Sequence, residues 1–206
     1  MQSNAILTWG AAGTPGEHDY AVTGIDSRKL GMWVFLASEC LFFGALISSY
    51  LLYRTRGPAD QRPGDVFDIP YTSVSSFVLL ISSLTMVLAL AAIQQGDHRR
   101  LRLWLMATAM LGAVFVGGQV YEFTVFTEEG LNLSSSVAAT SFFVLTGFHG
   151  VHVTVGVLWL LSLVGMSLQG ELPVERSLDI EIAGLYWHFV DVVWIVIFTI
   201  VYLVPL

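Results

Sequence analysis

The sequence predicts an all-α protein: an integral membrane bundle of five transmembrane helices, with the N-terminus inside and the C-terminus outside. Three observations predict this class. Only 12% of the 206 residues are charged and 55% are hydrophobic, more apolar surface than a soluble domain of this length can bury. Long stretches of the chain carry almost no charge, and they do not alternate as transmembrane β-strands would. Lys and Arg are divided unequally between the segments that join these stretches.

Composition also excludes other classes of protein. The formal net charge of −7 argues against a nucleic-acid partner, because phosphate recognition needs a basic surface. The single cysteine, Cys40, excludes a disulfide framework, a cysteine-rich zinc site and covalent haem attachment.

Each apolar stretch is long enough for one membrane span of about 20 residues, and lipid requires that a span be helical. The helices are expected at about 30–54, 70–95, 102–123, 136–168 and 179–204. The stretch 130–170 is uncharged and could hold one long helix or two short ones. Gly147, Gly150 and Gly156 lie there among apolar residues without turn-forming neighbours, a pattern typical of close helix packing, so we expect one helix.

The first 27 residues contain no Lys or Arg and no long apolar run, so they are not a secretory signal. We expect residues 1–28 to form a mobile tail and residues 29–206 to form a single transmembrane domain. Cytoplasmic segments are enriched in Lys and Arg. An N-terminus inside places Arg28, Lys29, Arg99, Arg100, Arg102 and Arg176 inside, and Arg54, Arg56 and Arg62 outside.

Ionisable residues at membrane depth cost roughly 3 kcal/mol each on insertion scales, so each one needs an explanation. Those within the spans or near their ends are Glu39, Glu122, His149, His152, Glu181, His188 and Asp191. Glu39 lies in the first span, where burial favours the neutral acid. It either contacts a proton path, a lipid headgroup or a partner subunit, or it hydrogen-bonds Ser38 or a neighbouring helix.

His149 and His152 are three residues apart and share a helix face, and His188 and Asp191 have the same spacing. Three interpretations compete: metal or haem ligation between facing helices, a proton relay, and interhelical hydrogen bonding in which Asp191 pairs with a histidine. We favour hydrogen bonding, because His152 lies near the centre of its helix and His188 near the start of its own. The aromatic residues near the span ends, including Tyr186, Trp187 and Tyr202, are expected in an interfacial belt.

Four motifs occur in order: WVFLASECLFF (33–43), GQVYEF (118–123), TGFHGVHVTVG (146–156) and GLYWHFVDVVWIVIF (184–198). Together they resemble subunit III of the haem–copper oxidases, over about residues 29–204. That family includes cytochrome c oxidase subunit III, its quinol oxidase equivalent and a nitric-oxide-reductase-associated relative. We expect cytochrome c oxidase; a free-standing membrane haem carrier or transporter is the alternative from another class.

The resemblance implies a non-catalytic subunit of a proton-pumping complex that reduces O2 to water in the plasma membrane of a bacterium. It implies direct packing on oxidase subunit I, association with subunit II and with small subunits or a larger respiratory assembly, and phospholipid between the helices. No haem or copper is expected in this chain, since the family holds both in partner subunits. Members of the mitochondrial type have two further helices before the first span, which in some complexes subunit I supplies.

Residues carry over individually. Glu39 matches an acidic residue on the subunit I side, and His149 and His152 match the two histidines of GFHGxHV. His188 and Asp191 match the pair in YWHFVDVVW. Glu122 and Glu181 match two acids near helix ends, and the family assigns all seven residues to helix packing, lipid contact and the subunit interface. Asp97 and His98, in the short inside segment 94–102, are suggested to gather protons for the partner, with an ordinary solvated loop as the alternative.

Overall fold

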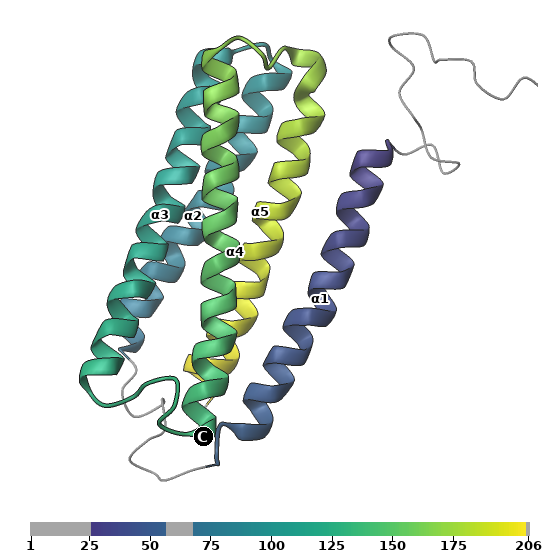
Figure 1. Ribbon diagram of the computed structural model, residues 1–206. Helices are drawn as coiled ribbons and strands as arrows, with labels where there is room; N and C mark the ends of the chain where they lie inside the picture. The colour runs from purple at the N-terminus through teal and green to yellow at the C-terminus, as the bar shows by residue number, and fades with distance from the viewer. Residues whose placement is uncertain (1–25, 57–67, 205–206) are drawn as a thin grey trace, which may run out of the picture.

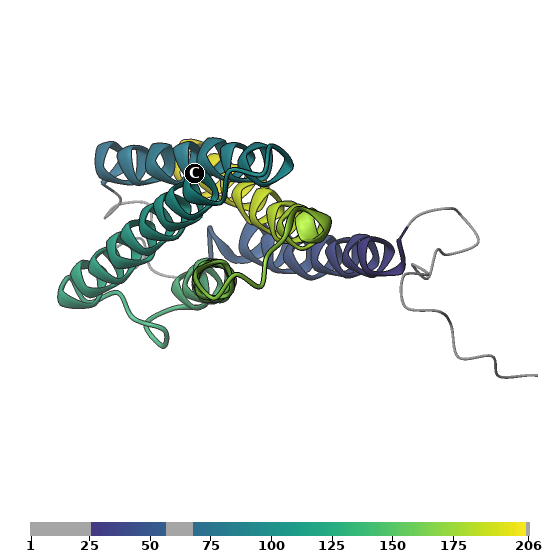
Figure 2. The ribbon, with the colours of Figure 1, turned by 90° about the horizontal axis from the view of Figure 1, so that it is seen from above.

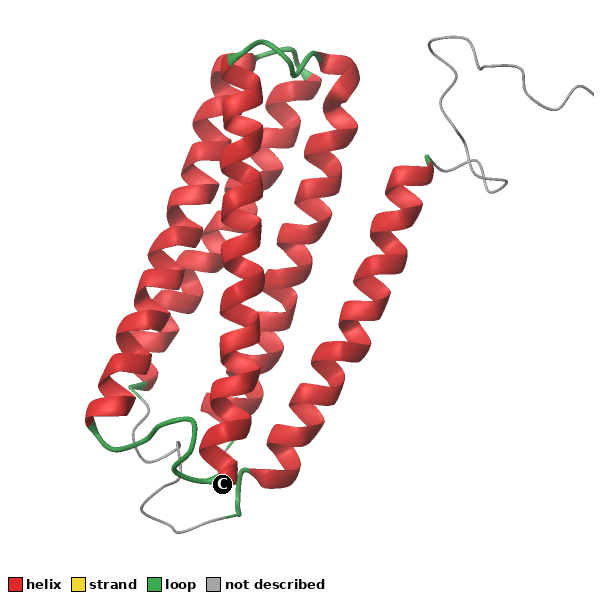
Figure 3. Ribbon diagram, in the orientation of Figure 1, coloured by secondary structure: helices red, strands yellow, loops and turns green. Residues whose placement is uncertain are grey.

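The computed structural model describes residues 26–56 and 68–204, which form helices and short connections (Figure 3). The long helices are α1 (Ser27–Tyr53), α2 (Ile69–Gln94), α3 (His98–Glu128), α4 (Val137–Leu168) and α5 (Ser177–Phe198). A 3-10 turn, η3 (Val174–Arg176), precedes α5, and a π-helical segment, η4 (Thr199–Leu203), continues it. The five long helices are all apolar and long enough to cross a membrane, and no described residue forms a strand. The predicted all-α fold with five spans is confirmed.

Nearly all of the predicted tail, residues 1–28, lies outside the described residues, as does Arg62. The stretch 130–170 holds one helix, α4, and not two. The third helix is longer at both ends than the predicted 102–123. It begins at His98 because the Asp97 carboxylate accepts a hydrogen bond of 2.9 Å from the Arg100 backbone N–H and so caps the first turn.

Short turns join the ends of α2 and α4 to the helices that follow. Gly96 and Gly170 end these helices with φ of +73° and +78°, a left-handed conformation that glycine adopts without strain. The backbone N–H of Asp97 then donates to the carbonyl of Ala92 at 3.0 Å, and that of Glu171 donates to the carbonyl of Met166 at 3.0 Å. These bonds satisfy helix-end carbonyls that would otherwise lack partners.

Helices α2 to α5 form a four-helix bundle, and α1 lies outside it against α4 and α5 (Figures 1 and 2). Only Leu36, Phe43 and Tyr50 of α1 are buried. The start of α1, the α2–α3 turn and the α4–α5 connection lie at one end of the molecule (Figure 1). This arrangement leaves most of α1 available to lipid or to another protein.

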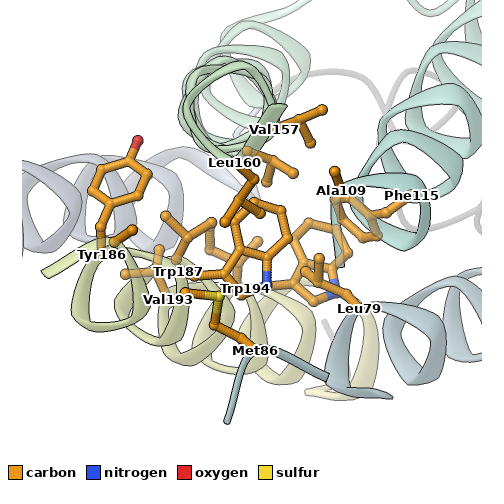
Figure 4. Close-up of a cluster of buried hydrophobic side chains, with 14 of the residues drawn as sticks. Leu79, Met86, Ala109, Phe115, Val157, Leu160, Tyr186, Trp187, Val193 and Trp194 are labelled. Atoms are coloured by element: carbon orange, nitrogen blue, oxygen red, sulfur yellow. The ribbon is translucent and has the colours of Figure 1, made fainter. Parts of the chain in front are cut away.

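The centre of the bundle is built around two tryptophans of α5 (Figure 4). Trp187 and Trp194 are buried, and their indole N–H groups donate to Ser82 at 2.9 Å and Ser76 at 2.8 Å, both on α2. A Cβ atom on Gly156 would lie 2.8 Å from the Trp187 ring. Glycine at that position therefore allows α4 to pack against α5 at the level of this ring.

The predicted glycine packing holds at two of three positions. A Cβ on Gly156 would meet Trp187, and one on Gly150 would lie 2.5 Å from the Gln119 side chain. A Cβ on Gly147 would meet nothing within 4 Å, so the prediction is wrong there. The expected aromatic belt is also wrong for Tyr186, Trp187 and Tyr202, which are at most 6% exposed because their side chains pack against neighbouring helices.

Candidate functional site: buried polar contacts between helices

Glu39 and His152 join α1 to α4. The Nε2 atom of His152 lies 3.3 Å from Oε2 of Glu39, and both side chains are largely shielded. The Nδ1 atom of His152 lies 2.7 Å from the carbonyl oxygen of Phe148. Because a carbonyl can only accept, Nδ1 carries a hydrogen. The acid and the imidazole therefore share one further proton, either as a neutral hydrogen-bonded pair or as an ion pair.

Aromatic rings surround this pair. The Phe43 ring packs edge-on against His152 with 5.0 Å between centroids, and Phe42 lies 6.2 Å from the same ring. These rings reduce water access and strengthen the polar contact. Glu39 thus contacts a neighbouring helix rather than Ser38, whose hydroxyl donates to the carbonyl of Phe35 at 2.7 Å.

His149 is one turn away on α4 and has different neighbours. It is fully buried, stacks on Trp194 at 4.9 Å and meets the edge of Phe115 at 5.8 Å. Neither of its ring nitrogens has a hydrogen-bond partner among the described residues. His149 therefore acts as an aromatic packing residue, and Asp191 does not pair with it or with His152.

A third contact joins α2 to α5 through Ser83, which the sequence did not single out. The Ser83 hydroxyl donates to Oδ2 of Asp191 and lies 2.9 Å from Nδ1 of His188. Asp191 is 3% exposed, so it needs this partner. The expected direct hydrogen bond between Asp191 and a histidine of another helix is therefore wrong: Ser83 of α2 contacts both Asp191 and His188, which lie on the same helix, α5. His188 also lies deeper than predicted, eleven residues after Ser177, where α5 begins.

Glu122 ties three elements together at the opposite end of the bundle from the α2–α3 turn. It is 7% exposed and accepts a hydrogen bond of 2.7 Å from the Thr72 hydroxyl of α2. The hydroxyl of Tyr202 in η4 donates to the same carboxylate at 3.2 Å. Neither Thr72 nor Tyr202 was predicted as a partner.

Charged contacts fasten the start of α1 to the start of α5. The Lys29 ammonium lies 2.5 Å from a Glu181 oxygen, and an Arg28 guanidinium nitrogen lies 2.9 Å from an Asp179 oxygen. Asp179 also accepts from Arg176 at 2.8 Å. These contacts place Glu181 between α1 and α5.

Asp97 and His98 lie at the α2–α3 turn. The Asp97 carboxylate caps α3 and lies 3.2 Å from the Arg100 guanidinium. His98 is the exposed first residue of α3. Nothing in these contacts tests the suggested proton-gathering role, which stays a prediction.

The fold and these contacts define a multi-pass membrane protein that uses most of the buried ionisable groups described above to join its helices. Over residues 26–56 and 68–204, no three His, Cys, Asp or Glu side chains gather as a metal site would require. His149 and His188 have separate neighbours, and the acids Glu39, Glu122 and Asp191 each contact a different pair of helices.

Comparison with known proteins identifies the family. The family model described as "Cytochrome c oxidase subunit III" matches residues 10–205. The chain is 40% identical over 194 residues to "Cytochrome c oxidase subunit 3" of Thermostichus vulcanus, covering 93% of this chain and 94% of that protein. It is 37% identical to the protein of that name from Bacillus sp. (strain PS3), with 86% of each chain covered. It is 38% identical to "Quinol oxidase subunit 3" of Bacillus subtilis (strain 168), covering 86% of this chain and 87% of the relative.

The chain belongs to the subunit III family of the haem–copper oxidases, and the resemblance predicted from the four motifs is confirmed. It is an accessory subunit of such an oxidase and a multi-pass membrane protein that associates with other oxidase subunits.

Proposed function

We propose that this chain supports O2 reduction to water and proton pumping by a terminal oxidase in a bacterial plasma membrane, and that it does so without binding haem or copper. The main observation that supports this function is that relatives named as oxidase subunit 3 match most of the chain. The contacts of the seven candidate residues support a proposed role for each in joining or packing helices: Glu39, Glu122, His149, His152, Glu181, His188 and Asp191. Such a subunit contributes stability and shape to a neighbour that carries the redox centres.

The proposed direct partner is oxidase subunit I, with subunit II and possible small subunits or a larger respiratory assembly beyond it. The exposed surface of α1 supports direct packing, because only three of its residues are buried by the bundle. Phospholipid is proposed to cover the remaining apolar surface. Under the positive-inside rule, the end that carries Arg28, Lys29 and the α2–α3 turn faces the inside.

The proposed electron donor of the complex is cytochrome c. A quinol is the second candidate, because relatives at 35% and 38% identity are named as ubiquinol and quinol oxidase subunits. Oxygen uptake by the purified complex with reduced cytochrome c, compared with uptake with a quinol, separates the two.

The test of this function is affinity purification of the tagged chain from membranes in a mild detergent. The tagged chain should bring with it a haem-bearing subunit and O2-reducing activity. After the subunits are separated, the tagged chain should lack a haem spectrum. Purification without any haem-bearing subunit, or a haem spectrum in the separated chain, contradicts the proposal and favours the free-standing carrier.

A further inference from the structure

A groove with a volume of about 440 Å³ lies on the outside of the molecule between α1 and α5. Trp33, Ala37 and Cys40 line it from α1, and Leu185, His188 and Val192 line it from α5. The lining is almost entirely apolar, and His188 contributes an imidazole ring to it. Trp33 and Val192 are 51% and 56% exposed, so they form an open rim.

His188 uses one of its two ring nitrogens inside the bundle. Its Nδ1 atom lies 2.9 Å from the hydroxyl of Ser83, which also holds Asp191. No described residue forms a hydrogen bond with Nε2, and the ring lines the groove. Nε2 is therefore available to a group that enters the groove from outside the chain.

The depth of this nitrogen decides what that group can be. His188 lies eleven residues after Ser177, the start of α5. Eleven residues correspond to about 16 Å of helix, which falls within a hydrocarbon core of roughly 30 Å. Acyl chains offer no hydrogen bond at this depth, and an unpaired polar atom facing them is costly. A helix of another membrane protein can present a polar side chain there.

We propose that the α1–α5 groove seats a transmembrane helix of another oxidase subunit, and that a hydroxyl, amide or carboxyl side chain of this helix hydrogen-bonds Nε2 of His188. The small side chains of Ala37 and Cys40 allow the partner helix to approach closely. The proposal rests on the proposed function, which supplies the complex, and adds the surface and the atom through which the partner is bound.

The first test is photocrosslinking in the assembled complex. A benzophenone amino acid replaces Val192 at the groove rim or, as the control, Val114 on α3. Val114 is 62% exposed, and its helix, α3, packs against α2 and α4, away from the groove. The Val192 position should give at least fivefold more adduct with another oxidase subunit than the Val114 position. An adduct at Val192 with lipid alone, or with a second copy of this chain, overturns the proposal.

The native thiol of Cys40 gives an independent result in the same preparation. Cys40 is exposed in the isolated chain and is its only cysteine. Maleimide should modify Cys40 slowly in the complex and at least tenfold faster after detergent separates the subunits. Equal rates overturn the proposal. Copurification with a haem-bearing subunit is scored separately, so failure of the groove is distinguishable from failure of the proposed function.

Two isosteric variants separate an interface role of His188 from an internal one. In His188→Asn, the amide replaces Nδ1 and keeps a partner for Ser83, whereas in His188→Gln the amide reaches the position of Nε2. If Nε2 binds the partner, detergent washing should remove His188→Asn from the complex at least threefold more than His188→Gln. Equal retention, or the reverse order, overturns the proposal.

Discussion

Glu39 of α1 lies 3.3 Å from His152 of α4, and this contact joins the outermost helix to the bundle at mid-length. The carbonyl of Phe148 fixes the hydrogen on the far nitrogen of the imidazole, so the near nitrogen faces the acid. Together with Lys29–Glu181 near the start of α1, the pair supplies specific contacts to a helix that has few buried residues.

Replacing Glu39 tests whether the pair is neutral. We predict that Glu39→Gln, whose amide can still donate to His152, unfolds at nearly the temperature of the parent protein in detergent. Glu39→Ala should lower the free energy of unfolding by about 0.5–2 kcal/mol, the range for interhelical hydrogen bonds in membranes. Ser38→Ala, on the neighbouring exposed position, is the control. Equal destabilisation by Gln and Ala would instead indicate an ion pair.

Glycine packing against Trp187 gives a second prediction. Gly156→Ala should destabilise the protein by about 1–3 kcal/mol, because its Cβ would lie 2.8 Å from the indole ring and force the helices apart. Gly147→Ala, on the same helix with nothing within 4 Å, should be neutral or slightly stabilising. Thermal unfolding of both variants checks this, and a similar loss at both positions would refute the packing argument.

The serine bridge predicts a third effect. Ser83→Ala removes the hydroxyl that links His188 to Asp191 and leaves a buried carboxyl with no partner. The free energy of unfolding should fall by about 1–3 kcal/mol. Ser73→Ala is the matched control on α2, since that exposed hydroxyl donates only to the carbonyl of Ile69. A loss at Ser83 no larger than the loss at Ser73 would show that the bridge contributes little.

The Lys29–Glu181 contact should be weak and sensitive to salt, since both side chains are about one third exposed. A double-mutant cycle with Lys29→Gln and Glu181→Gln should give a coupling energy of about 0.3–1 kcal/mol at low ionic strength. The coupling should decrease in high salt because ions screen exposed charges. A coupling energy of zero at low salt would mean that the contact does not hold α1.

Orientation in the membrane is a separate prediction from the distribution of Lys and Arg. Alkaline phosphatase fused after Leu206 should be active, because five spans and an inside N-terminus place the C-terminus outside. Green fluorescent protein fused at the same position should be non-fluorescent, because the fusion would then be carried to the outside of the membrane. A bright fluorescent fusion with an inactive phosphatase would reverse the orientation.

Hydropathy predicted the apolar stretches that form the five helices, because lipid requires a span to be helical. It left one or two helices open for 130–170, and the absence of turn residues around the glycines there predicted the single helix α4. Hydropathy could not predict that α1 lies outside the bundle, since all five spans are similarly apolar. The sequence did not predict the polar contacts of Ser83, Thr72 and Tyr202, which form hydrogen bonds between helices. Hydroxyl groups carry no charge signal, so their roles depend on packing that the sequence pattern does not contain.

The most direct test compares the purified oxidase with the same complex after this chain is removed. We predict that the depleted complex keeps its full haem spectrum and its initial rate of O2 uptake, while proton pumping and the duration of activity decrease and return when the chain is added back. Loss of a haem or copper signal in proportion to the chain removed would contradict the proposed non-catalytic role, because it would place a redox centre in this subunit.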